Sequence, residues 1–279
     1  MVGWIVGGVA AACAAVCGWG VWENHALMLR TVRIEDGALP AAFTGLRIAH
    51  LSDLHNARFG RGQRKLLQML AAAQPDLIAV TGDLIDKRRP GMANALDFAR
   101  GARAVAPVFY VPGNHEAASA EYPRLKRELS ACGVRVLEDD VAVWERDGAF
   151  LTIAGISDPR FCVPNQNDAI AQCMREKLAR VLPDRRGYTL LLTHRPETFG
   201  LYHAAGVPLV LCGHAHGGQF RLPWGGLIAP NQGLFPKYTQ GVYVKGDTRM
   251  CVSRGLGNSS IPIRLCNRPE VVLITLVSR

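Results

Sequence analysis

The stretch Leu46-Arg47-Ile48-Ala49-His50-Leu51-Ser52-Asp53-Leu54-His55 joins an apolar run to side chains that are able to bind a metal ion. The run is typical of a buried strand, and Asp53 and His55 follow it where the strand gives way to a loop. Four further polar motifs also follow apolar runs: Gly82-Asp83, Gly113-Asn114-His115-Glu116, Thr193-His194 and Gly213-His214-Ala215-His216. Polar side chains at strand ends are the usual site residues of layered α/β proteins, so this pattern predicts that class of fold.

Each motif has an ordinary explanation when it is taken alone. An Asp or a Gly-Asp after a strand often forms a turn or caps a helix. The two imidazoles of His214 and His216 suit a core poorly, because burying them unpaired is costly. Since all five motifs stand at strand ends, the set as a whole predicts a site for two metal ions. Gly82, Gly113 and Gly213 each precede a proposed ligand, where a residue without Cβ allows a close approach of the backbone.

This ordered set resembles the calcineurin-like metallophosphoesterase superfamily, whose pattern is Asp-x-His, Gly-Asp, Gly-Asn-His-(Asp/Glu), His and Gly-His-x-His. Every element is present, and the resemblance extends over residues 44–278. It implies a four-layer α/β/β/α sandwich of the metallophosphoesterase type, formed by a domain at 44–279. It also implies two sets of ligands that share Asp83 as a bridge: Asp53, His55 and His216 for one metal, and Asn114, His194 and His214 for the other.

The implied chemistry is phosphoester hydrolysis. Two cations about 3.5 to 4 Å apart hold phosphate oxygens and stabilise an in-line displacement at phosphorus. Mixed nitrogen and oxygen ligands suit Mn, Fe, Zn or Ni and do not choose between them. The catalytic residues implied are Asp53 and His115, with His115 protonating the leaving oxygen or stabilising charge as a cation. Glu116 and Asp53 are alternative partners that would orient His115.

The composition of the N-terminal segment differs from that of a soluble enzyme. Residues 1–22 contain no charged side chain, and a helix that rises about 1.5 Å per residue makes them long enough for a bilayer core of about 30 Å. Trp4 lies near one end and Trp19 and Trp22 near the other, as in interfacial belts. A signal peptide would carry basic residues first and a shorter apolar segment. We therefore predict an uncleaved transmembrane helix at 1–22, followed by a linker at 23–43.

The orientation of this anchor follows from the basic residues around it. No Lys or Arg precedes the segment, whereas Arg30, Arg33 and Arg47 follow it, so the positive-inside rule places the catalytic domain in the cytoplasm. The cysteines show no tight disulfide spacing, which agrees with this side. The predicted location is the bacterial cytoplasmic membrane, and an exported catalytic domain is the alternative.

The net charge of +9 and the pI of about 9.4 fit an acidic partner: a nucleic acid, an anionic membrane or a phosphorylated substrate. Basic residues cluster after the first two motifs, and we predict Arg58 and Arg88 as substrate contacts. A solvated basic surface is the alternative. The clusters lack interleaved aromatic residues, which argues against nucleic acid.

A long apolar segment follows the last motif. Residues 217–238 read GGQFRLPWGGLIAPNQGLFPKY, with more large apolar side chains than a loop needs. One interpretation is a hairpin packed on the second sheet. The other is a wall that accepts acyl chains or enters a bilayer, with Phe220 and Trp224 as substrate contacts.

The C-terminal stretch Ser253-Arg254-Gly255-Leu256-Gly257-Asn258, together with Ile263-Arg264, resembles one branch of the superfamily. That branch holds membrane-anchored or exported bacterial phosphodiesterases and the pyrophosphatase that cleaves UDP-2,3-diacylglucosamine. Arg254 and Arg264 are therefore predicted phosphate contacts, with structural ion pairs as the alternative.

Between the motifs, the sequence alternates strands with amphipathic helices at 63–73, 92–104, 121–131 and 167–181. A hairpin is expected around Asp147-Gly148. The combined prediction is a dinuclear-metal phosphohydrolase that cleaves a phosphodiester or pyrophosphate bond, in a lipid-linked substrate such as UDP-2,3-diacylglucosamine. The alternatives are an exported cell-envelope phosphodiesterase, a non-catalytic metal-binding scaffold and, least favoured, a nuclease.

Overall fold

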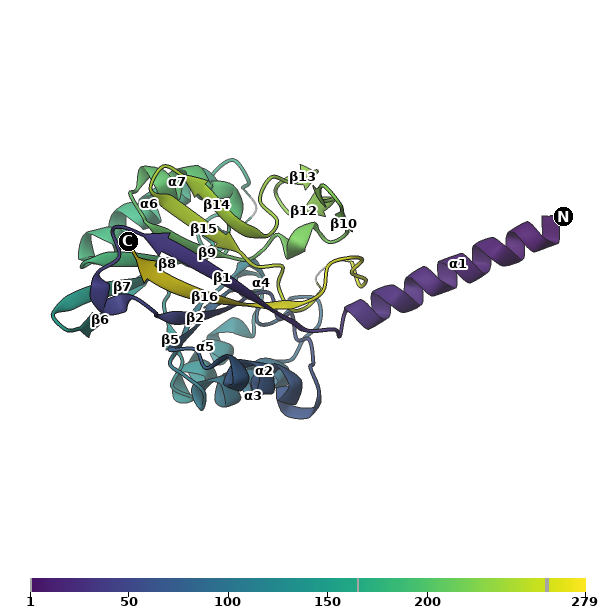
Figure 1. Cartoon of the computed structure of the whole chain (residues 1–279), viewed down its shortest axis with the longest axis horizontal. Coiled ribbons are helices and arrows are strands. Elements are labelled where there is room, and N and C mark those ends of the chain that lie inside the picture. Colours follow the sequence, from purple (N-terminus) through teal and green to yellow (C-terminus); the bar gives the residue numbers. More distant parts are fainter. Residues whose placement is uncertain (1, 165, 259–260) are drawn as a thin grey trace.

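Two six-stranded mixed sheets stack face to face in the computed structural model, with helices on both outer faces (Figure 1). The structure describes residues 2–164, 166–258 and 261–279. Within the N-terminal helix, the side chains of residues 2, 3, 5, 6, 9, 10, 12 and 13 lie outside this description. The predicted α/β sandwich of the metallophosphoesterase type is confirmed, because apolar clusters separate four layers in the order α/β/β/α.

The first sheet carries the strands that precede three of the five motifs. Its strands are β1 (Met28–Asp36), β2 (Arg47–Leu51), β3 (Leu77–Thr81), β4 (Val108–Val111), β5 (Arg135–Val136) and β16 (Glu270–Ser278). They are ordered β1-β16-β2-β3-β4-β5. The strands β2 to β5 run parallel, whereas β16 is antiparallel to β2 and parallel to β1. The loops after β2, β3 and β4 therefore meet at one edge of the sheet.

The second sheet brings the remaining motifs to the same end. Its strands are β6 (Asp140–Arg146), β7 (Ala149–Gly155), β8 (Tyr188–Leu192), β9 (Leu209–Cys212), β14 (Gly241–Lys245) and β15 (Thr248–Val252). They are ordered β14-β15-β9-β8-β7-β6, with β7, β8, β9 and β15 parallel. The predicted hairpin is β6–β7, and its turn residues Asp147 and Gly148 have φ of 51° and 74°. Such positive angles are those of the tight turns that suit the twist of a hairpin.

Helices cover both outer faces. The α-helices of the described residues are α1 (Val2–Glu23), which extends away from the sheets, and α2 (Arg64–Ala73), α3 (Ala93–Arg103), α4 (Asn114–Ala117), α5 (Tyr122–Ala131), α6 (Ile170–Val181) and α7 (Phe199–Ala204). Short 3-10 helices lie at Ala41–Phe43, Arg61–Gln63, Pro159–Phe161, Leu182–Asp184, Pro196–Thr198 and His216–Gly218. The four predicted helices match α2, α3, α5 and α6 to within three residues at each end.

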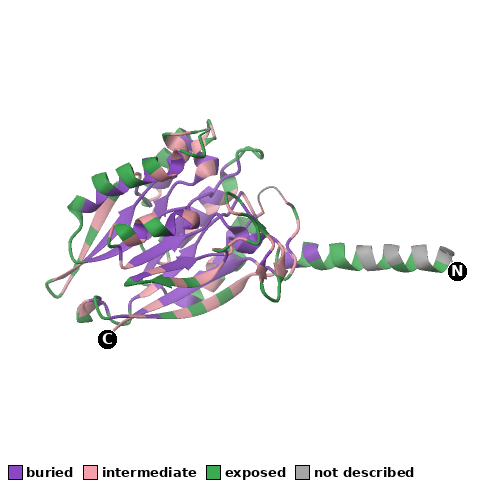
Figure 2. Cartoon of the chain, turned by 90° about the horizontal axis from the view of Figure 1, so that it is seen from above, coloured by how far each residue is buried: buried purple, intermediate pink, exposed green. Residues whose placement is uncertain are grey.

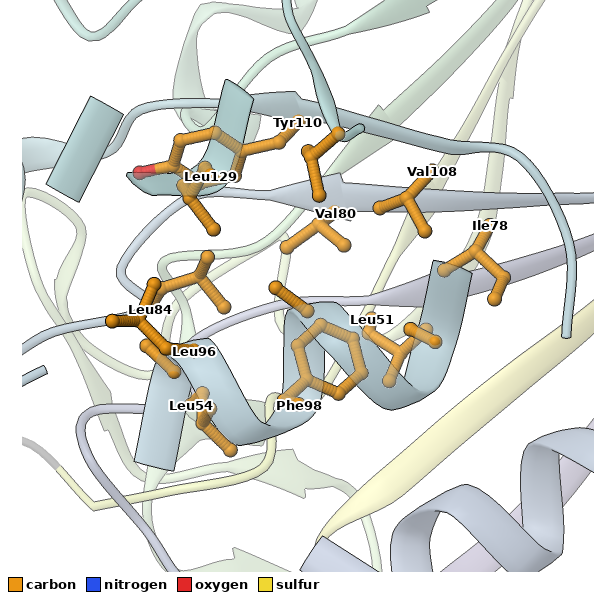
Figure 3. Close-up of a cluster of buried hydrophobic side chains, with 14 of the residues drawn as sticks. Leu51, Leu54, Ile78, Val80, Leu84, Leu96, Phe98, Val108, Tyr110 and Leu129 are labelled. Atoms are coloured by element: carbon orange, nitrogen blue, oxygen red, sulfur yellow. The ribbon is translucent and has the colours of Figure 1, made fainter. Parts of the chain in front are cut away.

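Neighbouring side chains of a strand point to opposite faces of its sheet and so belong to different apolar clusters. In β8, Leu190 lies between the two sheets, and Leu191 packs with α6 and α7 on the outer face. Figure 3 shows the cluster on the other side, where Phe98 of α3 packs near Leu51 and Val80 of the first sheet. Burying a side chain of this size contributes about 1.5 to 3 kcal/mol. Figure 2 shows the result as buried strands beneath helices whose outer turns are exposed.

The predicted linker at 23–43 requires a correction. It contains the nine-residue strand β1, which forms the edge of the first sheet beside β16. Several of its alternate side chains face water and several are charged, as in Met28-Leu29-Arg30-Thr31-Val32-Arg33. A half-exposed edge strand needs no continuous apolar run, and for this reason the sequence pattern did not distinguish it from a linker.

The predicted N-terminal helix is present as α1, which extends away from the sandwich (Figure 1). Its C-terminal end is fixed, because the carboxylate of Glu23 accepts a hydrogen bond from the Asn267 backbone at 3.0 Å. Over the residues that the structure describes, none of the helices is long and apolar enough to cross a membrane. The predicted transmembrane span at 1–22 is therefore not confirmed, and part of this segment lies outside the described residues.

Residues 219–238, called the insert below, form two small antiparallel sheets. These pair β10 (Arg221–Leu222) with β11 (Gly225–Gly226), and β12 (Ile228–Ala229) with β13 (Gly233–Leu234). Ala229 is buried in the apolar cluster under α6 and α7. The insert thus resembles the expected packed hairpin at its base, while much of it stands out from the sandwich (Figure 1).

Candidate metal centre

Six of the seven predicted ligands form two buried clusters at the ends of β2, β3, β8 and β9, and a third cluster, of His55, Asp86 and His115, adjoins the first. Five of the seven occupy the left-handed region of backbone conformation, with φ between 47° and 66°. They are Asp53, His55, Asp83, His214 and His216. This conformation costs a non-glycine residue about 1 to 3 kcal/mol and persists where the surroundings fix it. The backbones of neighbouring motifs supply that support: His55 donates to the carbonyl of Asp83 at 2.9 Å, and Asp53 to that of Gly82 at 3.0 Å.

The first cluster consists of Asp53, His55 and His216. The Nε2 atoms of His55 and His216 lie 3.2 Å apart. Oδ1 of Asp53 is 3.8 Å from the first of these nitrogens and 3.5 Å from the second. Ligand atoms about 2.0 to 2.2 Å from a central ion have separations of this size. The three side chains therefore fit one divalent ion.

The second cluster consists of Asp83, His194 and His214. Nε2 of His194 lies 3.2 Å from Oδ2 of Asp83 and 3.2 Å from Nδ1 of His214. The same Asp83 oxygen is 3.6 Å from Nε2 of His55 in the first cluster. One carboxylate oxygen thus faces both clusters, as the predicted bridging role requires.

Asn114, the remaining predicted ligand, supports the fit. Its Oδ1 atom is buried and has no hydrogen-bond partner among the described residues. A buried acceptor without a partner is costly, and a cation would satisfy it. The two clusters and this oxygen together form a donor set suited to two divalent ions.

The electrostatics of the clusters also favour cations. Burial raises the pKa of Asp83, but the neighbouring imidazoles of His194 and His115 outweigh it and hold the pKa well below the usual value. Burial opposes protonation of His194, yet the Asp83 and Asp53 carboxylates together raise its pKa to about 10. Positive charge is therefore stabilised between these carboxylates, as a site for divalent cations requires.

The glycines predicted beside the ligands have the expected role. A Cβ on Gly213 would overlap Oγ of Ser52 and the Asp53 carboxylate. Gly82 has φ of 95°, and a Cβ there would lie 2.6 Å from Nδ1 of His194. Side chains at these positions would displace ligands, which explains why glycine precedes them.

His115 lies at the edge of the first cluster, with its ring centroid 4.5 Å from that of His55. Its Nδ1 atom is 3.2 Å from Oδ1 of Asp86 and 3.3 Å from the backbone nitrogen of Lys87. Asp86, a residue outside the five motifs, therefore occupies the position predicted for Glu116 or Asp53. This carboxylate lies against the ring and fixes its position.

Glu116 has a different task. Its carboxylate accepts hydrogen bonds from the backbones of Asp83 at 2.8 Å, Gly113 at 2.8 Å and Ile85 at 3.1 Å. These bonds hold the loop that carries Asp83 against the loop that carries Asn114. Glu116 thus fixes the geometry of the second cluster rather than the orientation of His115.

A cavity of about 550 Å³ opens onto both clusters. Cationic and amide side chains line much of it: Lys87, Arg88, Arg160, Arg195, Asn114 and Asn231. Such a lining suits a phosphorylated molecule. Of the six predicted substrate contacts, Arg88 lines the cavity within the described part of the chain.

The other predicted substrate contacts lie elsewhere. Arg264 is fully buried and donates to the carbonyls of Arg254 at 3.0 Å, Asn267 at 3.3 Å and Gly257 at 2.6 Å. Arg254 bonds to Gln240 and lies 3.6 Å from Glu270. Arg254 therefore fits the alternative of a structural ion pair, and the contacts of Arg264 are hydrogen bonds within the fold. The remaining three stand away from the cavity lining: Arg58, Phe220 and Trp224.

Comparisons with known proteins agree with this geometry. The uncharacterized metallophosphoesterase YkuE of Bacillus subtilis is 28% identical over 262 residues, which cover 92% of this chain and 87% of that protein. A transmembrane protein with a metallophosphoesterase domain from Danio rerio is 27% identical over 261 residues, covering 88% of this chain and 56% of that protein.

The solved structure of TT1561 from Thermus thermophilus has a similar fold, with a TM-score of 0.52 at 17% identity over 76% of this chain and 91% of that one. The family described as calcineurin-like phosphoesterase matches residues 46–218, more than half of the chain. With its buried clusters of His and Asp, the chain therefore belongs to the calcineurin-like phosphoesterase family and is a metal-dependent phosphoric ester hydrolase.

Proposed function

We propose that the protein cleaves a phosphodiester or pyrophosphate bond in a lipid-linked substrate, using two metal ions. The use of two metal ions is supported by one oxygen of Asp83, which lies 3.6 Å from His55 and 3.2 Å from His194 and so faces both clusters. The clusters open onto the cavity lined by cationic side chains. The ions, when bound, supply a nucleophile near neutral pH and neutralise charge on the phosphate. Asp53, His55 and His216 would hold one, and Asn114, His194 and His214 the other, with Asp83 shared.

The other side chains of the site bind substrate and move a proton. Arg88 and Arg160 line the cavity, where they offer donors to phosphate oxygens. His115, held by Asp86 at 3.2 Å, would donate a proton to the leaving oxygen. The leaving groups of diesters and pyrophosphates, an alkoxide or a phosphate, accept such a proton.

The insert supports a lipid-linked substrate. Trp224, Leu234 and Phe235 are 75%, 66% and 65% exposed, which places three large apolar side chains in water. The insert also holds Arg221 and Lys237 but no acidic residue. Exposed apolar groups next to basic ones suit the surface of an anionic bilayer.

Hydrolysis is tested with bis-p-nitrophenyl phosphate and added Mn²⁺. We expect turnover in the wild-type protein and its loss after removal of the metal with a chelator. A non-catalytic scaffold, the alternative from a different class, would bind Mn²⁺ and release no nitrophenol.

The substrate class is tested by mass analysis of products from UDP-2,3-diacylglucosamine and from simple phospholipids. We expect Trp224→Ala combined with Phe235→Ala to slow hydrolysis of a lipid substrate in vesicles and to leave the soluble diester unaffected. Val244→Ala, which changes a side chain of β14 that is 64% exposed, serves as the control. Equal rates on the lipid substrate for the double variant and the control would contradict the lipid proposal.

We further propose that the protein works at the cytoplasmic face of a bacterial membrane, as the basic residues that follow the uncharged segment 1–22 support. A reporter fused to the C-terminus tests the side. Alkaline phosphatase activity of that fusion would favour the alternative, an exported cell-envelope phosphodiesterase.

A further inference from the structure

Asn231 of the insert reaches into the metal centre. Its Oδ1 atom lies 3.1 Å from Nε2 of His214 and 2.9 Å from Nη1 of Arg195. Its backbone has φ of 58°, a left-handed conformation that Asn tolerates better than most residues. The insert therefore contributes a polar side chain that contacts a predicted metal ligand, as well as an exposed apolar surface.

The position of Arg195 fixes which atom of Asn231 faces His214. Arg195 is 1% exposed and is held by Asp158 at 2.7 Å and Glu197 at 3.2 Å. A guanidinium group only donates hydrogen bonds, so the amide oxygen of Asn231, and not its nitrogen, must point toward it. This oxygen is then also the atom that faces the imidazole of His214.

The tautomer of His214 follows from this arrangement. The Asn231 oxygen accepts, so Nε2 of His214 must carry the hydrogen of that bond. In the neutral ring, Nδ1 then has a free lone pair, and it is the Nδ1 atom that lies 3.2 Å from Nε2 of His194 in the second cluster. The ring therefore presents its unprotonated nitrogen to the position of the ion.

We propose that Asn231 and Arg195 are positioning residues that fix the ring and the tautomer of His214 for the second metal ion. The proposal rests on the dinuclear centre of the proposed function. It adds that the insert completes this centre, because the residue that orients His214 belongs to β12–β13 and not to the sandwich. Hydrogen-bond partners of metal-bound histidines typically change metal affinity by about 10- to 100-fold when they are removed.

Metal affinity provides the first test, by titration of the metal-free protein with Co²⁺ against a chromophoric chelator. We expect Asn231→Leu to weaken the binding of one of two Co²⁺ ions by about 10- to 100-fold. Asn231→Asp keeps the acceptor oxygen and should rescue binding. Gln232→Leu is the matched control. The side chain of Gln232 makes two hydrogen bonds of 2.9 Å to the backbone of Tyr238 within the insert, and neither of them involves His214.

The outcomes are distinct. Unchanged Co²⁺ affinity in Asn231→Leu would overturn the proposal. An equal loss in Gln232→Leu would also overturn it, since the effect would then come from the folding of the insert. Neither result depends on phosphoester hydrolysis, so the failure of this proposal and the failure of the proposed substrate are distinguishable.

The tautomer provides the second test, without any metal. Long-range ¹H–¹⁵N spectra of the metal-free protein at a pH where His214 is neutral distinguish a hydrogen on Nε2 from one on Nδ1. We expect the Nε2 form in the wild-type protein and a mixture in Asn231→Leu. A wild-type His214 with its hydrogen on Nδ1 would contradict the proposed arrangement.

Discussion

The metal centre and the insert lie next to each other but are stabilised in opposite ways. The centre is fully buried, and glycines, backbone bonds and the Glu116 carboxylate fix its strained loops. The insert consists of two-residue strands with large apolar side chains in water. The chemistry thus depends on loops buried within the sandwich, whereas the region proposed to contact a lipid substrate exposes large apolar side chains and sends one residue, Asn231, into the centre.

Loss of the shared ligand is the strongest test of the rigid region. Asp83→Ala removes the oxygen that faces both clusters, and we expect it to lower kcat/KM by about 10³-fold or more, because metal ions contribute several kcal/mol to such reactions. Metal analysis of the purified variant should show fewer than two ions per chain. A variant that keeps both ions and its rate would show that the two clusters do not share a ligand.

His115 separates chemistry from metal binding. We expect His115→Ala to reduce kcat by about 10²- to 10⁴-fold, as is usual for the loss of a general acid. The metal content should be unchanged, because His115 lies outside the two clusters that the Asp83 oxygen faces. Loss of metal in step with activity would instead make His115 a ligand.

Substitution of Asp86 should lower kcat less than substitution of His115, because Asp86 acts through His115. A hydrogen bond to a charged group contributes about 1.5 to 3 kcal/mol, so Asp86→Asn is expected to lower kcat by about 10- to 100-fold. In the double variant with His115→Ala, the second change should add little. Additive losses in this double-mutant cycle would show that Asp86 acts independently of His115.

Substitutions in the sandwich and in the insert should also differ in their effect on the free energy of unfolding. Leu190 lies between the sheets, and Leu190→Ala should lower the free energy of unfolding of the metal-free protein by about 2 to 5 kcal/mol. Trp224→Ala in the insert should change it by less than about 0.5 kcal/mol. Urea denaturation measures both. A large loss for Trp224→Ala would mean that this side chain packs on the protein rather than facing solvent.

The same contrast explains what the sequence predicts well. Apolar runs that lead into Asp53, Asp83 and His214 indicate the strands and the ligand-bearing edge, because burial on both faces leaves a continuous pattern. The edge strand β1 has the pattern of a linker instead, since several of its exposed alternate positions are polar or charged. The local sequence pattern therefore predicts buried strands but does not predict a strand at the edge of a sheet.

Contacts between distant residues account for the rest of the site. Asp86 stands three residues after Asp83 and shares its loop, and this spacing was the available signal for it. Arg195 follows His194 directly, but its partners Asp158 and Asn231 are 37 and 36 residues away. No sequence period links such positions, so only the fold shows that they meet.

The place of β16 within the first sheet has a consequence for biosynthesis. This strand lies between β1 and β2 and pairs with both, although about 220 residues separate it from β2. A nascent chain on the ribosome therefore holds β1 without its neighbour until residues 270–278 have emerged. The half-assembled sheet exposes unpaired strand edges throughout that time, and such edges are able to pair with another chain.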